Sequence, residues 1–260
     1  MICSATRTTQ LGSGALLPMK KELRFGNRTF FPVVRTLGEM TEVVFDKRFL
    51  ARASKDMELY FMFREVSKDE DDAKKIKARE LRYDITIIPP NTLGVEFVKT
   101  AGHHHPYLPG SKLTYPEMYA VLEGDAHYLL QKREERDIEK ITDIAVVKAQ
   151  QGDKVIIPPN YGHVTINPAD APLKMANWVA RTFSSIYEPI AQRGGAAYFE
   201  LTTGEFIRNE RYEEVPDVRF ITPSDTWIRN HGLSTDIAMY DLLREPEKLA
   251  FLTNPADWFT

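Results

Sequence analysis

The chain has 260 residues, 43% of them hydrophobic and 27% charged, a balance typical of a soluble globular protein with one sizeable domain. The formal net charge of −3 excludes a global basic field that would attract nucleic acid or acidic lipid, so an anionic ligand must be held by local groups. No stretch approaches membrane-spanning length and Cys3 is the single cysteine, so we expect a cytoplasmic protein without disulfides and without membrane or nucleic-acid partners.

The first part of the chain predicts a tail followed by strands. Residues 1–21 are expected to be an N-terminal tail or arm, because they are rich in small and polar residues and show no clear cleavage pattern. Residues 41–46 and 57–66 are rich in β-branched and aromatic residues and are predicted as strands. The charged run at 67–80 predicts a solvated loop or an exposed helical turn.

Two hairpins are predicted in the middle of the chain. Residues 83–90 alternate and end in Pro-Pro, and the turn after them leads through the strand-like VEFVKT into three histidines. Residues 117–124 and 126–131 flank Gly124-Asp125, a dipeptide typical of hairpin turns. Further short strands are expected at 142–149, 154–159 and 173–180. Many short strands with frequent turns predict an antiparallel β-barrel or sandwich.

The histidine cluster at 103–105 marks a candidate metal site. His103 and His105 are two residues apart, so on an extended strand both imidazoles point to one face and His104 points to the other. Glu117 opens the next predicted strand, and His163 follows a Pro-Pro pair. Three imidazoles and a carboxylate suit Fe(II), Mn, Ni or Zn and leave positions open for a ligand. From the histidines alone, a solvated turn is an equal alternative.

The spacing of these residues resembles the two-part signature of the cupins. Gly124 lies seven residues after Glu117, and the second part follows as PPNYGHVTIN at residues 158–167. The resemblance is closer to the cupin-type phosphoglucose isomerases, because eleven residues separate His105 from Glu117, a longer gap than in other cupins. The similarity runs from about Arg35 to Gly194, which leaves both ends of the chain outside it.

The resemblance implies an all-β cupin domain, a double-stranded β-helix or jelly-roll barrel, at residues 22–217. After residue 217 the sequence pattern changes, and residues 218–260 are predicted to form a partly helical C-terminal extension. Four apolar residues of this extension are spaced as one amphipathic helix face, interrupted by Pro246: Ile237, Tyr240, Leu242 and Leu243. That face would cover either the barrel or a partner subunit.

The family resemblance also implies an activity, the metal-dependent interconversion of glucose 6-phosphate and fructose 6-phosphate in glycolysis and gluconeogenesis by a homodimer. One divalent metal per subunit, Fe(II) before Mn, Ni or Zn, would be held by His103, His105, Glu117 and His163. Glu117 is expected to carry the proton between C1 and C2 as well as to bind the metal. Tyr119 shares its strand parity and would orient the substrate oxygens. A hydride shift without a base stays open at this point.

The remaining site residues are expected to bind the sugar phosphate. The positions that match the family are Thr86, Thr100 and Gly102, with Tyr60 and Tyr187 as further cavity residues. A phosphate-binding tyrosine of the family falls at about Val179 here, and Arg181, two residues on, is predicted to replace it with a charged contact to phosphate.

Other functions remain to be weighed against this one. A different sugar-phosphate isomerase or epimerase of the cupin fold would use the same residues. A noncatalytic sugar-binding cupin would keep the pocket without turnover. A cupin oxygenase is disfavoured by the long gap between His105 and Glu117.

Overall fold

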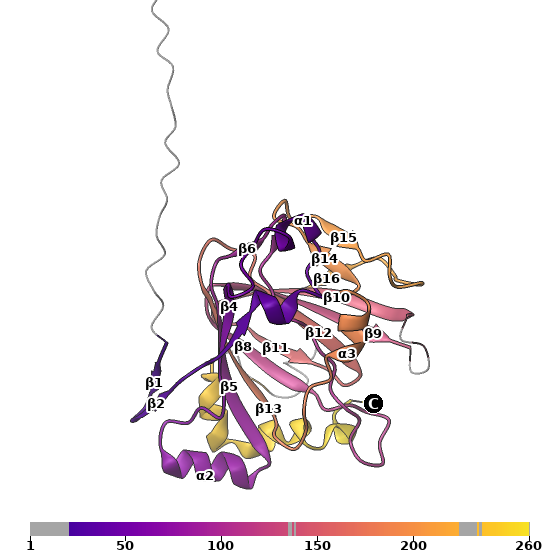
Figure 1. Cartoon of the computed structure of the whole chain (residues 1–260). Helices are drawn as coiled ribbons and strands as arrows, with labels where there is room; N and C mark the ends of the chain where they lie inside the picture. Colours follow the sequence, from indigo (N-terminus) through magenta and orange to yellow (C-terminus); the bar gives the residue numbers. More distant parts are fainter. Residues whose placement is uncertain (1–20, 135–136, 138, 224–232, 234–235, 260) are drawn as a thin grey trace, which may run out of the picture.

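The computed structural model describes residues 21–134, 137, 139–223, 233 and 236–259 (Figure 1). The N-terminal arm predicted over 1–21 therefore lies outside the described residues, apart from its last residue. No helix within these ranges is long and apolar enough to cross a membrane.

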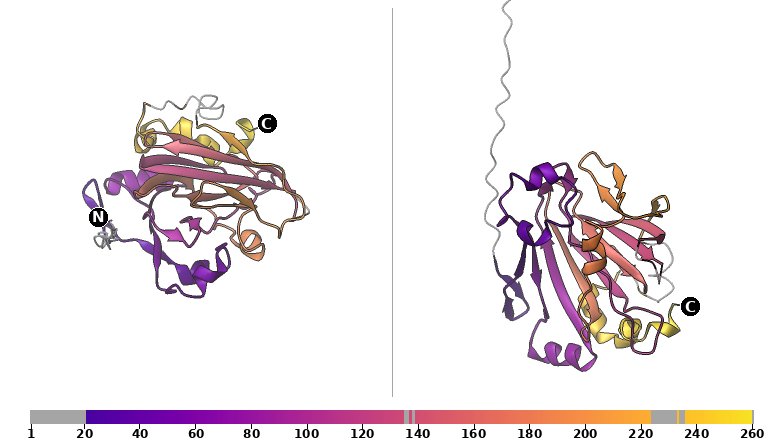
Figure 2. Two further views of the ribbon diagram at one scale, coloured as in Figure 1. Left: turned by 90° about the horizontal axis from the view of Figure 1, so that it is seen from above. Right: turned by 45° about the vertical axis from the view of Figure 1, so that its right-hand side comes forward.

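Two large sheets dominate the fold, and they face each other (Figures 1 and 2). The first has the order β11-β8-β13-β5-β4-β3, with strands Lys154–Ile157, Glu117–Glu123, Leu173–Ala180, Leu81–Ile88, Glu58–Phe63 and Val33–Thr36. The second has the order β12-β9-β10-β16, with strands Tyr161–Ile166, Asp125–Arg133, Ile141–Gln150 and Arg219–Ile221. All neighbours pair antiparallel except β10 and β16. The predicted all-β cupin fold is confirmed.

Small elements complete the described chain. Three two-stranded ribbons lie beside the large sheets: β1 (Leu23–Phe25) with β2 (Arg28–Phe30), β6 (Thr92–Leu93) with β7 (Glu96–Phe97), and β14 (Tyr198–Glu200) with β15 (Phe206–Arg208). The α-helices are short: α1 (Lys47–Leu50), α2 (Glu70–Ala78) and α3 (Glu188–Gln192). The 3₁₀ helices are η1 (Leu37–Met40), η2 (Met239–Arg244), η3 (Pro246–Leu252) and η4 (Pro255–Asp257).

Both faces of the six-stranded sheet are buried, because alternate residues of each strand enter different cores. On β8, Tyr119 and Val121 pack inside the barrel against β9 residues such as Tyr128, whereas Met118 packs on the outer face. The outer core includes Trp178 of β13 and a set of residues from the C-terminal segment: Tyr240, Leu242, Leu243, Leu249 and Phe251. The inward residues of this sheet are the ones available to form a site.

The C-terminal segment folds as short 3₁₀ helices, so the prediction of one amphipathic helix is wrong in detail. Pro246 and Pro255 each begin a new 3₁₀ helix, since proline lacks the N–H that a continuous helix needs. The segment covers its own barrel, where the Trp178 indole donates to the Met239 carbonyl at 2.9 Å.

Three local predictions were wrong. Residues 41–46 form turns, because the Asp46 side chain accepts from the N–H groups of Arg48 and Phe49 and so caps α1. The segment 83–90 does not pair with VEFVKT: β5 lies between β13 and β4, and β7 pairs with β6. The strands on either side of Gly124 do not form a hairpin either, since β8 and β9 belong to different sheets. The charged run at 67–80 contains α2, in agreement with the predicted helical turn.

Gly124 is the point at which the chain crosses from one sheet to the other. Its φ is +81°, and an added Cβ would lie 2.6 Å from the Pro172 carbonyl oxygen. Gly204 has nearly the same φ, +82°, with no atom within 4 Å of an added Cβ. Substituting each glycine in turn therefore separates the free-energy cost of the left-handed backbone from the free-energy cost of a steric clash.

We expect Gly124→Ala to lower the free energy of unfolding by about 1–2 kcal/mol for the left-handed backbone and by roughly 1–3 kcal/mol more for the clash. Gly204→Ala should show only the first of these losses. Urea denaturation of both variants measures the difference, and equal losses would show that the crossing tolerates a side chain.

Candidate active site

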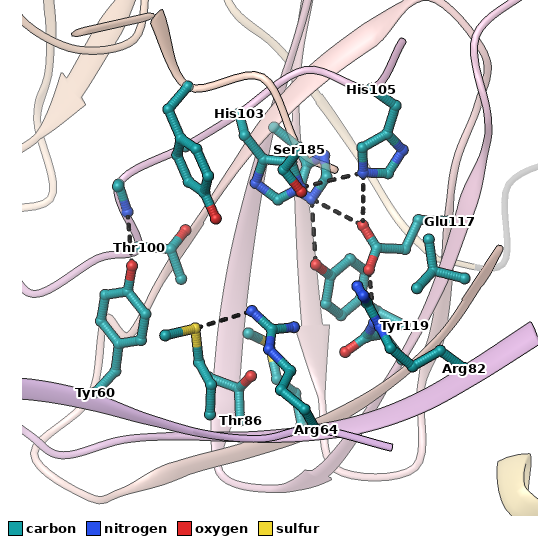
Figure 3. A pocket seen from close by; sticks show the side chains of 18 residues that line it. Tyr60, Arg64, Arg82, Thr86, Thr100, His103, His105, Glu117, Tyr119 and Ser185 are labelled. Carbon is teal, nitrogen blue, oxygen red and sulfur yellow. Dashed lines mark hydrogen bonds and ion pairs between the residues drawn. The ribbon is translucent and has the colours of Figure 1, made fainter. Parts of the chain in front are cut away.

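Four potential ligands converge inside the barrel from segments far apart in the sequence. His103, His105, Glu117 and His163 each bring one ligand atom, and these atoms all lie within 4.8 Å of one another. Two backbone hydrogen bonds, of 3.2 and 3.0 Å, join His103 to His163 and so align the histidine segment with β12. Glu117 comes from the start of β8 in the facing sheet. The structure thus brings together the four predicted metal ligands (Figure 3).

The ligand atoms are close enough to require a shared partner. The Nε2 atoms of His103 and His105 are 3.1 Å apart, and Glu117 Oε2 lies 3.4 Å from His105 Nε2 and 3.2 Å from His163 Nε2. Glu117 Oε2 is buried without a hydrogen-bond donor among the described residues. Buried polar atoms of this kind are normally satisfied, and one cation in their midst would satisfy all of them.

Neighbouring groups orient two of the ligands. The His105 Nδ1 lies 2.8 Å from the Tyr115 carbonyl oxygen and donates to it, which leaves the lone pair on Nε2 facing the cluster. The Asn177 amide donates to Glu117 Oε1 at 2.7 Å, so Oε2 is the oxygen left for a cation or a proton. Asn177 reaches it from the adjacent strand, β13.

The protonation states of the histidines and of Glu117 also favour the binding of a cation. Burial holds the pKa of His103 well below its ordinary value and also lowers the pKa of His163, so both imidazoles stay neutral. Burial alone would raise the pKa of Glu117, but its close contacts with His105 and His163 outweigh burial and hold that pKa well below its ordinary value. A carboxylate among neutral imidazoles is a donor set that fits a divalent metal.

His104 points away from the cluster. Its ring packs against Gly162, where an added Cβ would lie 2.4 Å from the imidazole, and its backbone N–H donates to the Ile186 carbonyl. Burial, followed by the charge of Arg133, lowers the pKa of His104 to about 3. His104 is therefore a neutral, buried packing residue, as strand parity predicted.

The long segment between His105 and Glu117 folds back on itself. The Leu108 N–H donates to the Leu113 carbonyl, and the Tyr115 N–H donates to the Pro106 carbonyl. The additional residues therefore form a closed loop that returns the chain to the cluster and delivers the Tyr115 carbonyl to His105.

A small cavity opens onto the cluster. Of the predicted substrate-binding residues, it is lined by Tyr60, Thr86, Thr100, Gly102 and Tyr187. Tyr119 also lines it, with its hydroxyl 3.2 Å from His163 Nε2. Gly102 has a φ of +79°, and an added Cβ would lie 2.5 Å from the Val164 side chain, so this position is restricted to glycine by packing and conformation.

Arg181 is the predicted site residue that the structure does not bring into this cavity. Its guanidinium lies 3.1 Å from Glu65 Oε1 and lines a neighbouring cavity. Strand β13 ends at Ala180, so the alternation of side chains does not extend to residue 181. The phosphate role of Arg181 stays a prediction that this geometry does not support.

Several lining residues were missed by the sequence analysis, among them Arg64, Arg82, Asn177 and Ser185. A signal for Arg82 was present, because it has the strand parity of Thr86 in β5, whereas Arg64 follows the last residue of β4 and had no such signal. Val179, expected at the position of the family tyrosine, also lines the cavity and pairs in register with Arg82.

Comparisons with known proteins point to one family. A family model described as Glucose-6-phosphate isomerase (GPI) matches residues 34–217. Glucose-6-phosphate isomerase of Pyrococcus abyssi is 28% identical over 166 residues, which cover 59% of this chain and 82% of the relative. The protein of the same name from Pyrococcus furiosus is 27% identical over 177 residues, 63% of this chain and 87% of the relative.

Similarity to solved structures is weaker. Oxalate decarboxylase from Bacillus subtilis matches 54% of this chain with a TM-score of 0.35 and 16% identity. A Cupin_2 domain of an XRE family transcriptional regulator from Enterobacter cloacae matches 46% with a TM-score of 0.29 and 9% identity. The chain spans 30% of the former protein and 94% of the latter. At these TM-scores the likeness carries no information about function.

Metal content should distinguish the neighbouring histidines. We expect His105→Ala and His163→Ala to lose most of the metal, because each removes a ligand atom, whereas His104→Ala should keep about one ion per chain. Elemental analysis of folded protein, checked by circular dichroism, measures this. Equal loss from His104→Ala would refute the ligand assignment.

Proposed function

This chain belongs to the glucose-6-phosphate isomerase family, and we propose that it is a metal-dependent aldose-ketose isomerase that interconverts glucose 6-phosphate and fructose 6-phosphate. The observation that carries the proposal is the convergence of three imidazoles and one carboxylate at the wall of a polar cavity. Polar groups that line such a cavity can orient a ligand beside a metal.

The metal ligands in this proposal are His103, His105, Glu117 and His163. A divalent cation held there would supply Lewis acidity to the carbonyl and hydroxyl oxygens at C1 and C2 of the sugar. We propose Fe(II) as the metal. Mn, Ni and Zn are alternatives, because a site of nitrogen and carboxylate donors accepts any of these ions.

Glu117 is proposed as the group that moves the proton between C1 and C2. Asn177 holds Oε1, so Oε2 is the oxygen that takes the proton from one carbon and returns it to the other. The low pKa of Glu117 means that it begins the reaction as a base.

Tyr119 is proposed to orient the reacting oxygens. Burial, and then the charge of Glu117, raises the pKa of Tyr119 well above its ordinary value, so its hydroxyl keeps the proton at neutral pH. An O–H donor beside His163 and Glu117 can bind a substrate oxygen without competing as a base. The hydroxyls of Tyr60, Thr86, Thr100 and Tyr187 and the backbone at Gly102 provide further contacts to the sugar phosphate.

Activity should depend on the metal. We expect the purified protein to convert fructose 6-phosphate in a coupled assay, to lose that activity after chelation, and to regain it when a divalent metal is restored. Adding Fe(II), Mn, Ni and Zn separately identifies the effective ion. Full turnover by protein shown to be metal-free would contradict the proposal, and sugar binding without turnover would favour a noncatalytic binding cupin.

Solvent exchange tests the role of Glu117. Isomerisation in D₂O should place deuterium on the product carbon, because a protonated carboxylate exchanges with solvent when the cavity opens. Glu117→Gln should lower kcat by about 10²–10⁴-fold, the usual contribution of a positioned acid or base. Complete retention of the substrate hydrogen, with appreciable turnover by Glu117→Gln, would favour hydride transfer instead.

We further propose that the protein works in the cytoplasm as a homodimer. Phe31 and Val33, beside and within the outer strand β3, are 73% and 59% exposed, and an apolar strand edge of this kind suits pairing with a second copy. The molar mass measured by light scattering, for the wild type and for Phe31→Ser, decides between a dimer and a monomer.

A further inference from the structure

Asp84 of β5 is a fully buried carboxylate beside two arginines that line the cavity. Its relative exposure is 0%, and it accepts hydrogen bonds from Arg64 Nη1 at 2.7 Å and from the Glu65 backbone N–H at 2.9 Å. Arg82 Nε lies 2.8 Å from the same oxygen that Arg64 contacts. A buried charge is costly unless it is paired, so Asp84 holds both guanidinium groups at one place.

Both arginines keep donors that Asp84 does not use. The second terminal amine of Arg64 contacts only the Met62 sulfur, at 3.0 Å, and a thioether is a weak acceptor. Within the described ranges no acceptor engages the terminal amines of Arg82. The two side chains are 39% and 24% exposed, so a ligand in the cavity can reach them.

The two guanidinium groups line the same cavity as the metal ligands. Figure 3 shows Arg64 extending from the side of β4 and β5 toward the histidines, with Arg82 on the same side near Glu117. A sugar phosphate that places C1 and C2 at the histidines needs an anion-binding group elsewhere in the cavity for its phosphate.

Charge balance supports an anionic ligand. At their formal charges, Arg64 and Arg82 balance Asp84 and Glu117, and a divalent cation would add positive charge at the histidines. Guanidinium groups match phosphate oxygens in geometry as well as in charge.

We propose that Arg64 and Arg82, held in place by Asp84, bind the phosphate group of the substrate and select phosphorylated over unphosphorylated sugars. This inference rests on the proposed function for the identity of the substrate. Asp84 acts through the arginines and is a positioning residue.

A neighbouring cavity offers a competing location for the anion. Arg82 lines both cavities, and the second is also lined by Arg28, Lys77 and Arg181. It contains Glu65, which pairs with Arg181, and the metal ligands do not line it. An anion there would lie away from the reacting carbons, so variants must distinguish the two cavities.

The kinetic test compares Arg64→Gln and Arg82→Gln with Arg219→Gln. Arg219 is a matched control, because it pairs with Asp143 at 2.6 Å on the other sheet and does not line the cavity. Each cavity variant should raise KM for fructose 6-phosphate by about tenfold or more and change kcat less, as expected when remote binding is lost. Metal content should be unchanged in all three variants.

A binding test separates this inference from the isomerase proposal. Calorimetry with inorganic phosphate, on metal-free protein, should show binding by the wild type and by Arg219→Gln that weakens by about tenfold in Arg64→Gln and Arg82→Gln. Asp84→Asn should weaken it similarly, with circular dichroism confirming the fold. This result would support the inference even if wild-type protein failed to isomerise fructose 6-phosphate.

Three outcomes would overturn the inference. The first is that the wild type binds no phosphate in either the metal-free or the metal-loaded form. The second is that Arg64→Gln and Arg82→Gln bind phosphate and fructose 6-phosphate as tightly as the wild type does. The third is that Arg181→Gln weakens phosphate binding while Arg64→Gln does not, which would place the anion in the neighbouring cavity.

Discussion

The site depends on one electrostatic constraint, the burial of a carboxylate among three imidazoles whose ligand atoms lie within 4.8 Å of one another. Such a cluster is unfavourable without a cation, because buried polar atoms then lack partners. The fold maintains it by clamping His103 to His163 through the backbone and by anchoring Glu117 through Asn177. The protein therefore holds a cluster suited to a divalent metal, in which Tyr115 and Asn177 orient His105 and Glu117.

Burial on both faces of the six-stranded sheet makes this arrangement rigid. The inner face carries Glu117 and Tyr119, while the residues between and beyond them pack beneath the C-terminal 3₁₀ helices. Tyr240 links this cover to α2, because its hydroxyl donates to Asp72 and accepts from the Lys68 N–H. The C-terminal segment thus supports the site from outside, and none of its described residues lines the cavity.

The cavity contains two groups of residues with different electrostatic properties. At the histidines, burial keeps imidazoles neutral so that their lone pairs remain available. Beside β4 and β5, one buried carboxylate pairs with two guanidinium groups and holds them close together. The histidine cluster is suited to a metal, and the arginine pair is suited to an anion. A phosphorylated sugar matches both, because it carries a carbonyl group at one end and a phosphate at the other.

The resemblance to the cupin motif pointed to Glu117 and His163 as candidate ligands, but the sequence by itself predicted the all-β class and the pair formed by His103 and His105. It could do so because alternation along a strand is a local property: the spacing of His103 and His105 separates them from His104 regardless of what packs around them. Strand positions from residue 57 onward were also largely predictable, since β-branched and aromatic runs bounded by turns are local signals.

Only the tertiary structure decided which strands pair and which charges share a cavity. Gly124 looked like a hairpin turn but is a crossing between sheets, because β8 pairs with β11 and β13 whereas β9 pairs with β10 and β12. Arg181 does not line the cavity of the metal ligands, because β13 ends one residue before it. Arg64 and Arg82 do line it, and both contact Asp84. Such pairings are set by burial and by partners distant in sequence, which local patterns do not encode.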